Sequence, residues 1–256
     1  MSQNHNGATA LDNEDEFCNV AAYKFVTLDA AELIALRKKF KQRGTALSIK
    51  GTILLSTEGI NLFLAGHAAD IENFQKLLHS HAFFEDLSYK YSYSRFIPFE
   101  KLFVKIRTEI VTFRQPHIQP AIATAPYLSP QDLYNKLQRN DDFLLLDTRN
   151  TFEYEMGSFD KATHLNIENF REFPDALHQN DDQLDKNKPV VTFCTGGIRC
   201  EKAAAYLLEQ GFREVYQLQG GILNYFAECG GEHYTGNCFV FDDRVAINDR
   251  LEPVDN

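Results

Sequence analysis

Hydrophobic and polar positions in the first half of the chain alternate between strand-like runs and helical spacing. Strand-like patterns occur at residues 19–28, 46–55, 60–65, 87–94 and 102–110. After Asp29, which is placed to cap a helix, Leu33, Leu36 and Phe40 recur at helical spacing, and Gly44 is expected to end that helix. Residues 67–79 predict a second helix. The resulting order βαββαβ is that of a ferredoxin-like α+β domain, which we expect over residues 17–111.

The second half has the pattern of an α/β domain with a parallel sheet. Continuous apolar runs at residues 142–147 (DFLLLD), 189–193 (PVVTF) and 215–218 predict buried parallel strands. Residues 199–210 predict a helix between two of them, and strands separated by helices imply helices on both faces of the sheet. We expect this domain at residues 131–232, with a C-terminal extension at 233–256. The linker expected at residues 112–130 contains half of the chain's eight prolines.

Composition and charge change this picture in two ways. The 256 residues are 44% hydrophobic and 24% charged, and no apolar stretch approaches the ~20 residues that span a bilayer. Residues 1–16 are acidic without an apolar signal core, so we expect a disordered arm and a cytoplasmic protein. The net charge of −10 is uneven, because residues 17–125 carry +5 and residues 126–256 carry −11. The first domain is therefore better suited to an anionic partner, although a solvated face gives the same pattern.

Cys194 is the strongest candidate for a reactive group. It follows the strand at 189–193 and opens a loop before a helix, made of Thr195, Gly196, Gly197, Ile198 and Arg199. The two glycines allow backbone N–H groups to point into the loop, and the helix N-terminus and an arginine add positive charge. Such surroundings lower a cysteine pKa from about 8.5 to roughly 3.5–7.5. A small buried hydrophobe is the alternative, but this spacing favours a reactive thiolate.

The other cysteines and the length of the Cys194 loop limit the kinds of site that the chain can form. Five cysteines without a C-x-x-C pair argue against a disulfide framework and against a structural zinc site. Only four residues separate Cys194 from Arg199, one fewer than in the C-x5-R loop of cysteine phosphatases, so the loop suits a single extra sulfur better than a phosphate. Cys200 is a candidate to resolve an oxidised Cys194, with a packed helix cysteine as the alternative.

Several motifs resemble those of a known family. The second domain resembles the rhodanese family in its D-x-R segment, Asp147-Thr148-Arg149, and in its late V-x-x-L-x-G-G segment at residues 215–221. A narrower set resembles the rhodanese-containing tRNA uridine hydroxylases: DTRNTFEYEMGSF (147–159), CTGGIRCEK (194–202), FREFP (170–174), STEGIN (56–61) and EIV (109–111). That resemblance implies an acylphosphatase-like first domain and formation of 5-hydroxyuridine at the tRNA wobble position.

The resemblance also implies roles for individual residues and co-substrates. Cys194 is the expected catalytic, persulfide-forming residue, and Asp147 and Arg149 either organise the floor of the site or form a simple ion pair. Molecular oxygen is the implied co-substrate, with an electron donor that no motif identifies, and no metal site is expected. Leu62 departs from the family pattern, in which a glycine is expected there. Longer relatives continue into a Cys-rich tail that this sequence lacks, which calls any tail-dependent metal or substrate role into question.

Basic residues of the first domain are candidates for tRNA contacts. They are Arg37, Lys38, Lys39, Lys41, Arg43, Arg95, Lys101, Lys105 and Arg107. Lys90 and Arg114 belong to the same half, where aromatic residues such as Phe103 are interleaved with the basic ones, a mixture that suits phosphate contacts and base stacking. A solvated helix face with core aromatics is the alternative. Two other functions stay open, a persulfide sulfurtransferase and a non-enzymatic tRNA- or protein-binding module with a redox cysteine, and the oligomeric state is not indicated.

Overall fold

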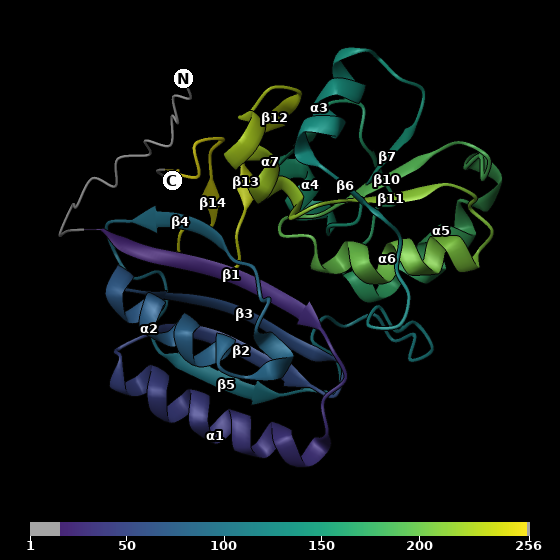
Figure 1. The fold of residues 1–256 in the computed structure, drawn as a ribbon. Helices are drawn as coiled ribbons and strands as arrows, with labels where there is room; N and C mark the ends of the chain where they lie inside the picture. The colour runs from purple at the N-terminus through teal and green to yellow at the C-terminus, as the bar shows by residue number, and fades with distance from the viewer. Residues whose placement is uncertain (1–15, 255–256) are drawn as a thin grey trace, which may run out of the picture.

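The described chain forms two lobes that lie side by side, each with its own sheet (Figure 1). The structure is a computed structural model that describes residues 16–254. The expected acidic arm at residues 1–16 therefore lies outside the described residues, apart from Glu16. No helix within residues 16–254 combines the length and the apolar character that a membrane span requires.

The first lobe is a five-stranded sheet in the order β4-β1-β3-β2-β5, in which β5 runs parallel to β2 and the other neighbours are antiparallel. Its strands are β1 (Phe17–Phe25), β2 (Lys50–Ser56), β3 (Gly59–Gly66), β4 (Lys90–Ser94) and β5 (Leu102–Ile106). Its helices are α1 (Ala30–Ala46), α2 (Ala68–His79) and the short 3-10 helix η1 (Ala82–Phe84). Strands β1 to β4 and helices α1 and α2 confirm the ferredoxin-like fold, to which β5 adds an edge strand.

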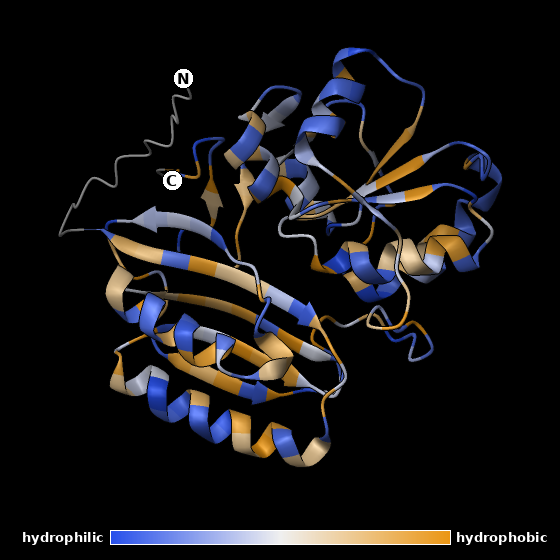
Figure 2. Ribbon diagram, in the orientation of Figure 1, coloured by the Kyte–Doolittle hydropathy of each residue, from blue (hydrophilic) through white to orange (hydrophobic). Residues whose placement is uncertain are grey.

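Both long helices of this lobe lie on one face of the sheet, so the other face is left open. Strand residues alternate between the two faces, and on β1 the side chains of Val20 and Ala22 join the buried core beneath α1 and α2. Ala21 and Tyr23 point to the opposite face, which is turned toward the second lobe (Figure 1). Orange, hydrophobic segments are frequent on the strands, while α1 carries several blue, hydrophilic segments (Figure 2).

Helix α1 begins where the sequence predicts and ends later. Asp29 forms a capping box with Glu32 and accepts a hydrogen bond from the Ala31 N–H. The expectation that Gly44 ends the helix is wrong, because the helix continues to Ala46. Gly44 is instead a packing position, since a Cβ atom there would lie 2.6 Å from Cδ2 of Leu102 on β5. Strand β5 is shorter than the predicted 102–110, because the residues after Ile106 leave the sheet toward the second lobe.

The second lobe is a parallel sheet in the order β6-β11-β10-β7-β9 with helices on both faces, as predicted. Its strands are β6 (Tyr127–Leu128), β7 (Leu144–Asp147), β9 (Thr163–His164), β10 (Val190–Phe193) and β11 (Val215–Leu218). One face carries α3 (Pro130–Gln138) and α7 (Gly221–Cys229), and the other carries α5 (Phe173–Gln179) and α6 (Ile198–Glu209). The remaining elements are α4 (Thr151–Met156), β8 (Gly157–Phe159), η2 (Phe170–Glu172), η3 (Asp181–Gln183), β12 (Tyr234–Gly236), β13 (Cys238–Phe239) and β14 (Ala246–Ile247).

The segments expected as linker and extension are both built into the structure. Residues 112–130 contain β6, and Phe113 is fully buried in the second lobe, where its ring stacks on that of Phe170 at 4.8 Å. The C-terminal extension pairs β13 with β14, and the turn between these strands contacts the first lobe, where Arg244 Nη1 donates to Ser92 Oγ on β4 at 2.7 Å. Residues 112–130 are therefore part of the second lobe, and the extension ties the two lobes together.

A buried lysine joins three of the sequence motifs across the lobes. Lys202 of α6 is 1% exposed, and its Nζ lies 2.9 Å from carboxylate oxygens of both Glu58 and Glu109. The same ammonium donates to the carbonyl oxygen of Val111 at 3.1 Å. Glu58 belongs to STEGIN, Glu109 to EIV and Lys202 to CTGGIRCEK, so these motifs form one ionic cluster between the lobes.

Replacing Lys202 by methionine should destabilise the protein by about 3 kcal/mol, because two partly buried carboxylates would lose their counter-charge. This is the low end of the range for buried pairs, since Glu58 and Glu109 keep some solvent contact. Urea unfolding of both proteins measures the change in the free energy of unfolding. Lys76→Met, which removes an exposed pair with Glu72, is the matched control and should cost about 0.5 kcal/mol or less. Equal effects of the two substitutions would contradict the role of the cluster.

Candidate active site

Cys194 lies at the carboxyl end of β10, in the loop that leads into α6. The backbone N–H of Gly197 donates to Cys194 Sγ at 3.1 Å, as expected for an anion-binding loop. Gly197 has φ +97°, a conformation that favours glycine. Gly196 is not among the residues with positive φ, so only Gly197 uses the conformational freedom of glycine in this loop.

The loop is held from behind by the start of α7. The carbonyl oxygens of Cys194 and Thr195 accept hydrogen bonds from the N–H groups of Ile222 and Leu223 at 3.0 and 3.1 Å. A Cβ atom at Gly221 would lie 2.4 Å from the Cys194 carbonyl oxygen, so only glycine allows this close approach. The late V-x-x-L-x-G-G motif thus supports the cysteine loop.

Arg199 is not a free cation that faces the centre of the loop. Its guanidinium is buried and paired with Glu153 of α4, with Nη1–Oε2 and Nη2–Oε1 distances of 2.6 and 2.8 Å. The pair spans the base of the loop and fixes α4 against α6. Glu153 was visible in the sequence as a motif residue, but its partner was not.

The contacts around Cys194 favour its thiolate form. Burial alone would raise its pKa, but three kinds of contact outweigh that effect: a hydrogen bond from Cys200, the charge of Arg199, and the N–H groups of Arg199 and Gly197. Together they lower the pKa of Cys194 from 9.0 to about 5. Burial and the hydrogen bond to Cys194 raise the pKa of Cys200, so Cys200 stays a thiol and donates its proton. Cys200 is fully buried in α6, where its Sγ lies 3.8 Å from Thr148 Oγ1.

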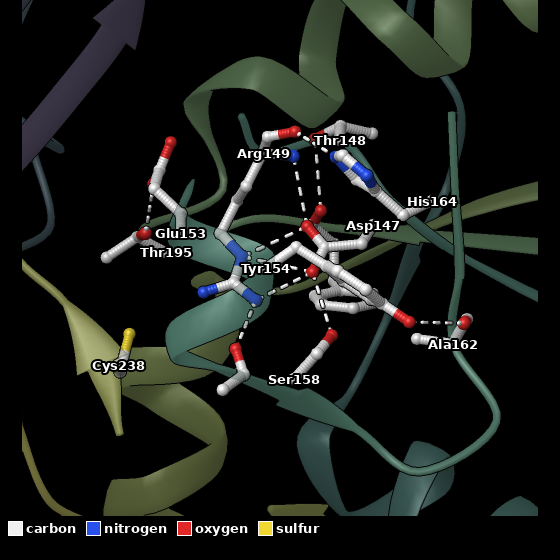
Figure 3. A network of polar contacts seen from close by, with 12 residues as sticks. Asp147, Thr148, Arg149, Glu153, Tyr154, Ser158, Ala162, His164, Thr195 and Cys238 are labelled. Carbon is white, nitrogen blue, oxygen red and sulfur yellow. Dashed lines mark hydrogen bonds and ion pairs between the residues drawn. The ribbon is translucent and has the colours of Figure 1, made fainter. Parts of the chain in front are cut away.

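Asp147 and Arg149 form a buried network beside the loop (Figure 3). Arg149 Nη2 donates to Asp147 Oδ2 and to the Gly157 carbonyl oxygen, both at 2.6 Å, and Ser158 Oγ donates to the same Asp147 oxygen at 2.8 Å. Neither charged residue lines the cavity at Cys194. Their geometry is that of an ion pair that joins the end of β7 to β8.

A cavity of about 420 Å³ lies between the cysteine loop and the open face of the first sheet. Cys194 and Gly196 form one wall, and Tyr23, Phe63 and Lys90 on β1, β3 and β4 belong to the opposite wall. Further lining residues come from the FREFP motif, Phe170 and Arg171, and from the C-terminal extension, Val240, Phe241 and Arg244. The volume falls within the ~300–1,000 Å³ of small-molecule sites.

Lys90 places an amine on the wall that faces Cys194. Its Nζ lies 4.6 Å from the centre of the Tyr23 ring. Burial lowers the pKa of Lys90 to about 8, although the negative charges of Cys194 and Glu201 act in the opposite direction. In the sequence Lys90 is one of several basic residues of the first domain, because nothing local shows that β4 faces the cysteine.

Tyr23 connects the first lobe directly to the cysteine helix. Its hydroxyl donates to Glu201 Oε1 on α6 at 3.1 Å, and Tyr127 donates to the same oxygen at 2.6 Å. A Cβ atom at Gly197 would lie 2.9 Å from the Tyr23 oxygen. Gly197 is therefore required both by its backbone conformation and by the neighbouring lobe.

The candidate tRNA-binding residues do not lie on one surface. Those of α1 lie on the helix side of the sheet, away from the cavity, and there Arg37 and Lys41 donate to the carbonyl oxygens of Val104 and Leu102 on β5. Lys101 and Lys105 flank the ring of Phe103 on β5. The other members are exposed and line no part of the cavity: Lys38, Lys39, Arg43, Arg95 and Arg107.

The fold and the site define a two-lobed protein whose second lobe carries a cysteine loop of the rhodanese type. Residues 17–110 match the UPF0176 acylphosphatase like domain, and residues 129–228 match the rhodanese-like domain. The chain is 47% identical to a tRNA uridine(34) hydroxylase of Cupriavidus metallidurans, over 93% of this chain and 85% of that protein. It is 48% identical to a tRNA uridine(34) hydroxylase of Bordetella petrii, over 92% and 94% of the two chains. This chain belongs to the tRNA uridine(34) hydroxylase family.

Among solved structures, the chain is similar to the rhodanese-like domain of an Anabaena protein. The match covers 43% of this chain and 79% of the Anabaena chain, with 22% identity and a TM-score of 0.38. The match of the rhodanese domain family to residues 129–228 and the observed parallel sheet together confirm the predicted class of the second domain.

The pH dependence of alkylation should report the Cys194 thiolate. Modification of Cys194 by iodoacetamide, followed by peptide mass spectrometry, should rise with a midpoint near pH 5. Cys200→Ala removes a hydrogen bond to the anion and should move the midpoint up by about one to two pH units, which corresponds to the ~1.5–3 kcal/mol of such a bond. Cys229→Ala, at the end of α7, is the matched control and should leave the midpoint unchanged. A wild-type midpoint near 9 would show that the loop does not hold a thiolate.

Proposed function

We propose that this chain hydroxylates uridine 34 of tRNA to 5-hydroxyuridine, with Cys194 as the reactive group. The observation that carries the proposal is the cavity in which the Cys194 loop faces the open sheet of the first lobe. Enzymes that act on a base in nucleic acid hold that base outside its stack in a pocket. A cavity of about 420 Å³ is large enough for one nucleoside, and an anticodon loop presents its bases in single-stranded form.

Each lobe contributes one wall of the cavity and, in this proposal, one of the two functional groups. Cys194 brings a nucleophilic sulfur, as thiolate or persulfide, to the base of the cavity. Lys90 brings an ammonium group to the opposite wall, where it is suited to hold a carbonyl oxygen of uracil or a negative charge that develops on it. Molecular oxygen is the proposed co-substrate, and the two electrons that reduce its second atom to water come from a separate donor.

The charge distribution supports binding of the tRNA mainly to the first lobe. Residues 17–125 carry a net charge of +5 and residues 126–256 carry −11, so a polyanion is repelled by most of the second lobe. Arg171 is an exception, because it is exposed at the edge of the cavity on the rhodanese side. Phosphates next to the inserted nucleotide are within the reach of such a side chain.

Loss of Cys194 should abolish the modification. In a strain that lacks the gene, complementation with the wild type should restore 5-hydroxyuridine derivatives in tRNA, whereas Cys194→Ala should restore none, because the alanine removes the reacting sulfur. Nucleoside mass spectrometry of total tRNA measures the result. Cys229→Ala is the matched control and should restore wild-type levels.

Two outcomes would redirect the proposal. Unchanged 5-hydroxyuridine in the deletion strain, with no second pathway present, would exclude the hydroxylase function. Loss of thiouridines in place of 5-hydroxyuridine, together with Cys194-dependent sulfur transfer from thiosulfate by the purified protein, would identify a sulfurtransferase instead.

Substitution of Lys90 should lower catalysis and alter its pH profile. Lys90→Met should reduce kcat/KM by about 10²-fold or more, as when one donor to a developing negative charge is removed. In the wild type, activity should rise through pH ~5 as Cys194 deprotonates and fall through about pH 8 as Lys90 loses its proton. Lys90→Arg should recover part of the activity and remove the fall near pH 8, because arginine stays charged. If the activity of Lys90→Arg still falls near pH 8, the group that titrates there is not Lys90.

A further inference from the structure

The wall of the cavity continues onto a part of the sheet that the second lobe does not cover. Backbone register places five residues in one row across all five strands: Lys90, Ala21, Phe63, Thr52 and Phe103. The first three line the cavity, whereas Thr52 is half-buried and Phe103 is 38% exposed. Neighbouring strands are ~4.8 Å apart, so Phe103 lies about 10 Å from Phe63 along the same face.

Phe103 is flanked by two ammonium groups. Lys101 Nζ lies 5.0 Å and Lys105 Nζ lies 4.4 Å from the centre of its ring. These three residues alternate with Leu102 and Val104, which are buried under α1, so their side chains belong to the open face. An exposed aromatic ring between two cations is the combination that stacks a base and contacts the phosphates beside it.

Further basic residues surround this part of the sheet. A hollow at the end of β2 and β5 is lined by Leu54, Arg107 and Arg114. Glu109 also lines this hollow, but its carboxylate is bound to Lys202 and accepts the Phe113 N–H. The uncompensated charge at this end of the sheet is positive, which complements a nucleic acid backbone.

We propose that the exposed face of β2 and β5, centred on Phe103, binds an unpaired nucleotide next to the one that enters the cavity. Phe103 stacks on its base, and Lys101 and Lys105 contact its phosphates. The proposal rests on the proposed function, since continuity with the cavity defines which nucleotide is bound. The proposal assigns RNA contacts to the basic residues of β5. The basic residues of α1 lie on the other face of the sheet and do not contact the RNA.

Binding of an anticodon stem-loop RNA to the full chain tests the surface. The RNA carries an unmodified uridine at position 34, and fluorescence anisotropy gives the dissociation constant. Phe103→Ala should weaken binding by roughly 5- to 150-fold, the range for loss of one stacked base, and Phe103→Tyr should restore it. Tyr93→Ala is the matched control, because Tyr93 is 51% exposed and pairs with the buried Cys18 on the helix side of β1.

An abasic RNA identifies the stacked base. Removal of the base on one side of uridine 34 should weaken binding to the wild type, and Phe103→Ala should then add little, because both changes remove the same contact. If the loss of affinity from Phe103→Ala adds in full to the loss from an abasic site on either side of uridine 34, the proposal is overturned. Lys105→Met should lower the slope of log affinity against log salt by about one, whereas Lys38→Met on α1 should leave it unchanged.

The outcomes separate this surface from the proposed function. If the wild type hydroxylates the RNA but Phe103→Ala binds it with wild-type affinity, the surface is overturned and the hydroxylase function stands. If the wild type neither binds nor hydroxylates the RNA, both fail. A Phe103→Ala protein that changes only its oligomeric state in light scattering, with RNA binding intact, would assign the face to contact between copies of this chain.

Discussion

The ionic cluster at Lys202 is the contact on which the rest of the site depends. Lys202 belongs to α6, and the loop at the start of that helix carries Cys194. Its partners Glu58 and Glu109 come from the strand ends of the first lobe. A buried ammonium between two carboxylates tolerates little displacement, because any separation leaves charge without a partner in a region of low polarity. The cluster therefore fixes how far the first sheet stands from the cysteine loop, and the cavity is the space left between them.

Electrostatic compensation explains how a thiolate exists in the acidic half of the molecule. The negative net charge of residues 126–256 disfavours an anion there. The groups in contact with the Cys194 sulfur, however, are hydrogen-bond donors and a cation, which favour an anion. Short-range hydrogen bonds from Gly197 and Cys200 outweigh the distant acids, most of which are screened by solvent. Glu153 holds the Arg199 guanidinium in place, and the charge of Arg199 acts together with the N–H and S–H donors to lower the pKa of Cys194.

The ferredoxin-like lobe contributes through the face that its helices leave open. One half of that face forms the cavity wall with Lys90, Tyr23 and Phe63. The other half carries Phe103 and is exposed. One row of residues across this sheet thus begins in the cavity and continues onto an exposed surface. Such an arrangement fits an RNA that inserts one nucleotide into the cavity and lays the next one on the exposed surface. The rhodanese lobe alone has the reactive loop but not the opposite wall.

Local pattern determined much of the fold and singled out the candidate reactive residue. The order of strands and helices follows from periodicity, and Cys194 could be predicted from a buried strand, two glycines and a helix start, all within a few residues. What only the tertiary structure decided involves residues far apart in the chain: Lys202 with Glu58 and Glu109, Tyr23 with Glu201, and Lys90 opposite Cys194. Periodicity shows which face of an element is buried but not which partner covers it. For the same reason the basic residues of α1 and β5 looked alike in sequence, and the structure places them on opposite faces of one sheet.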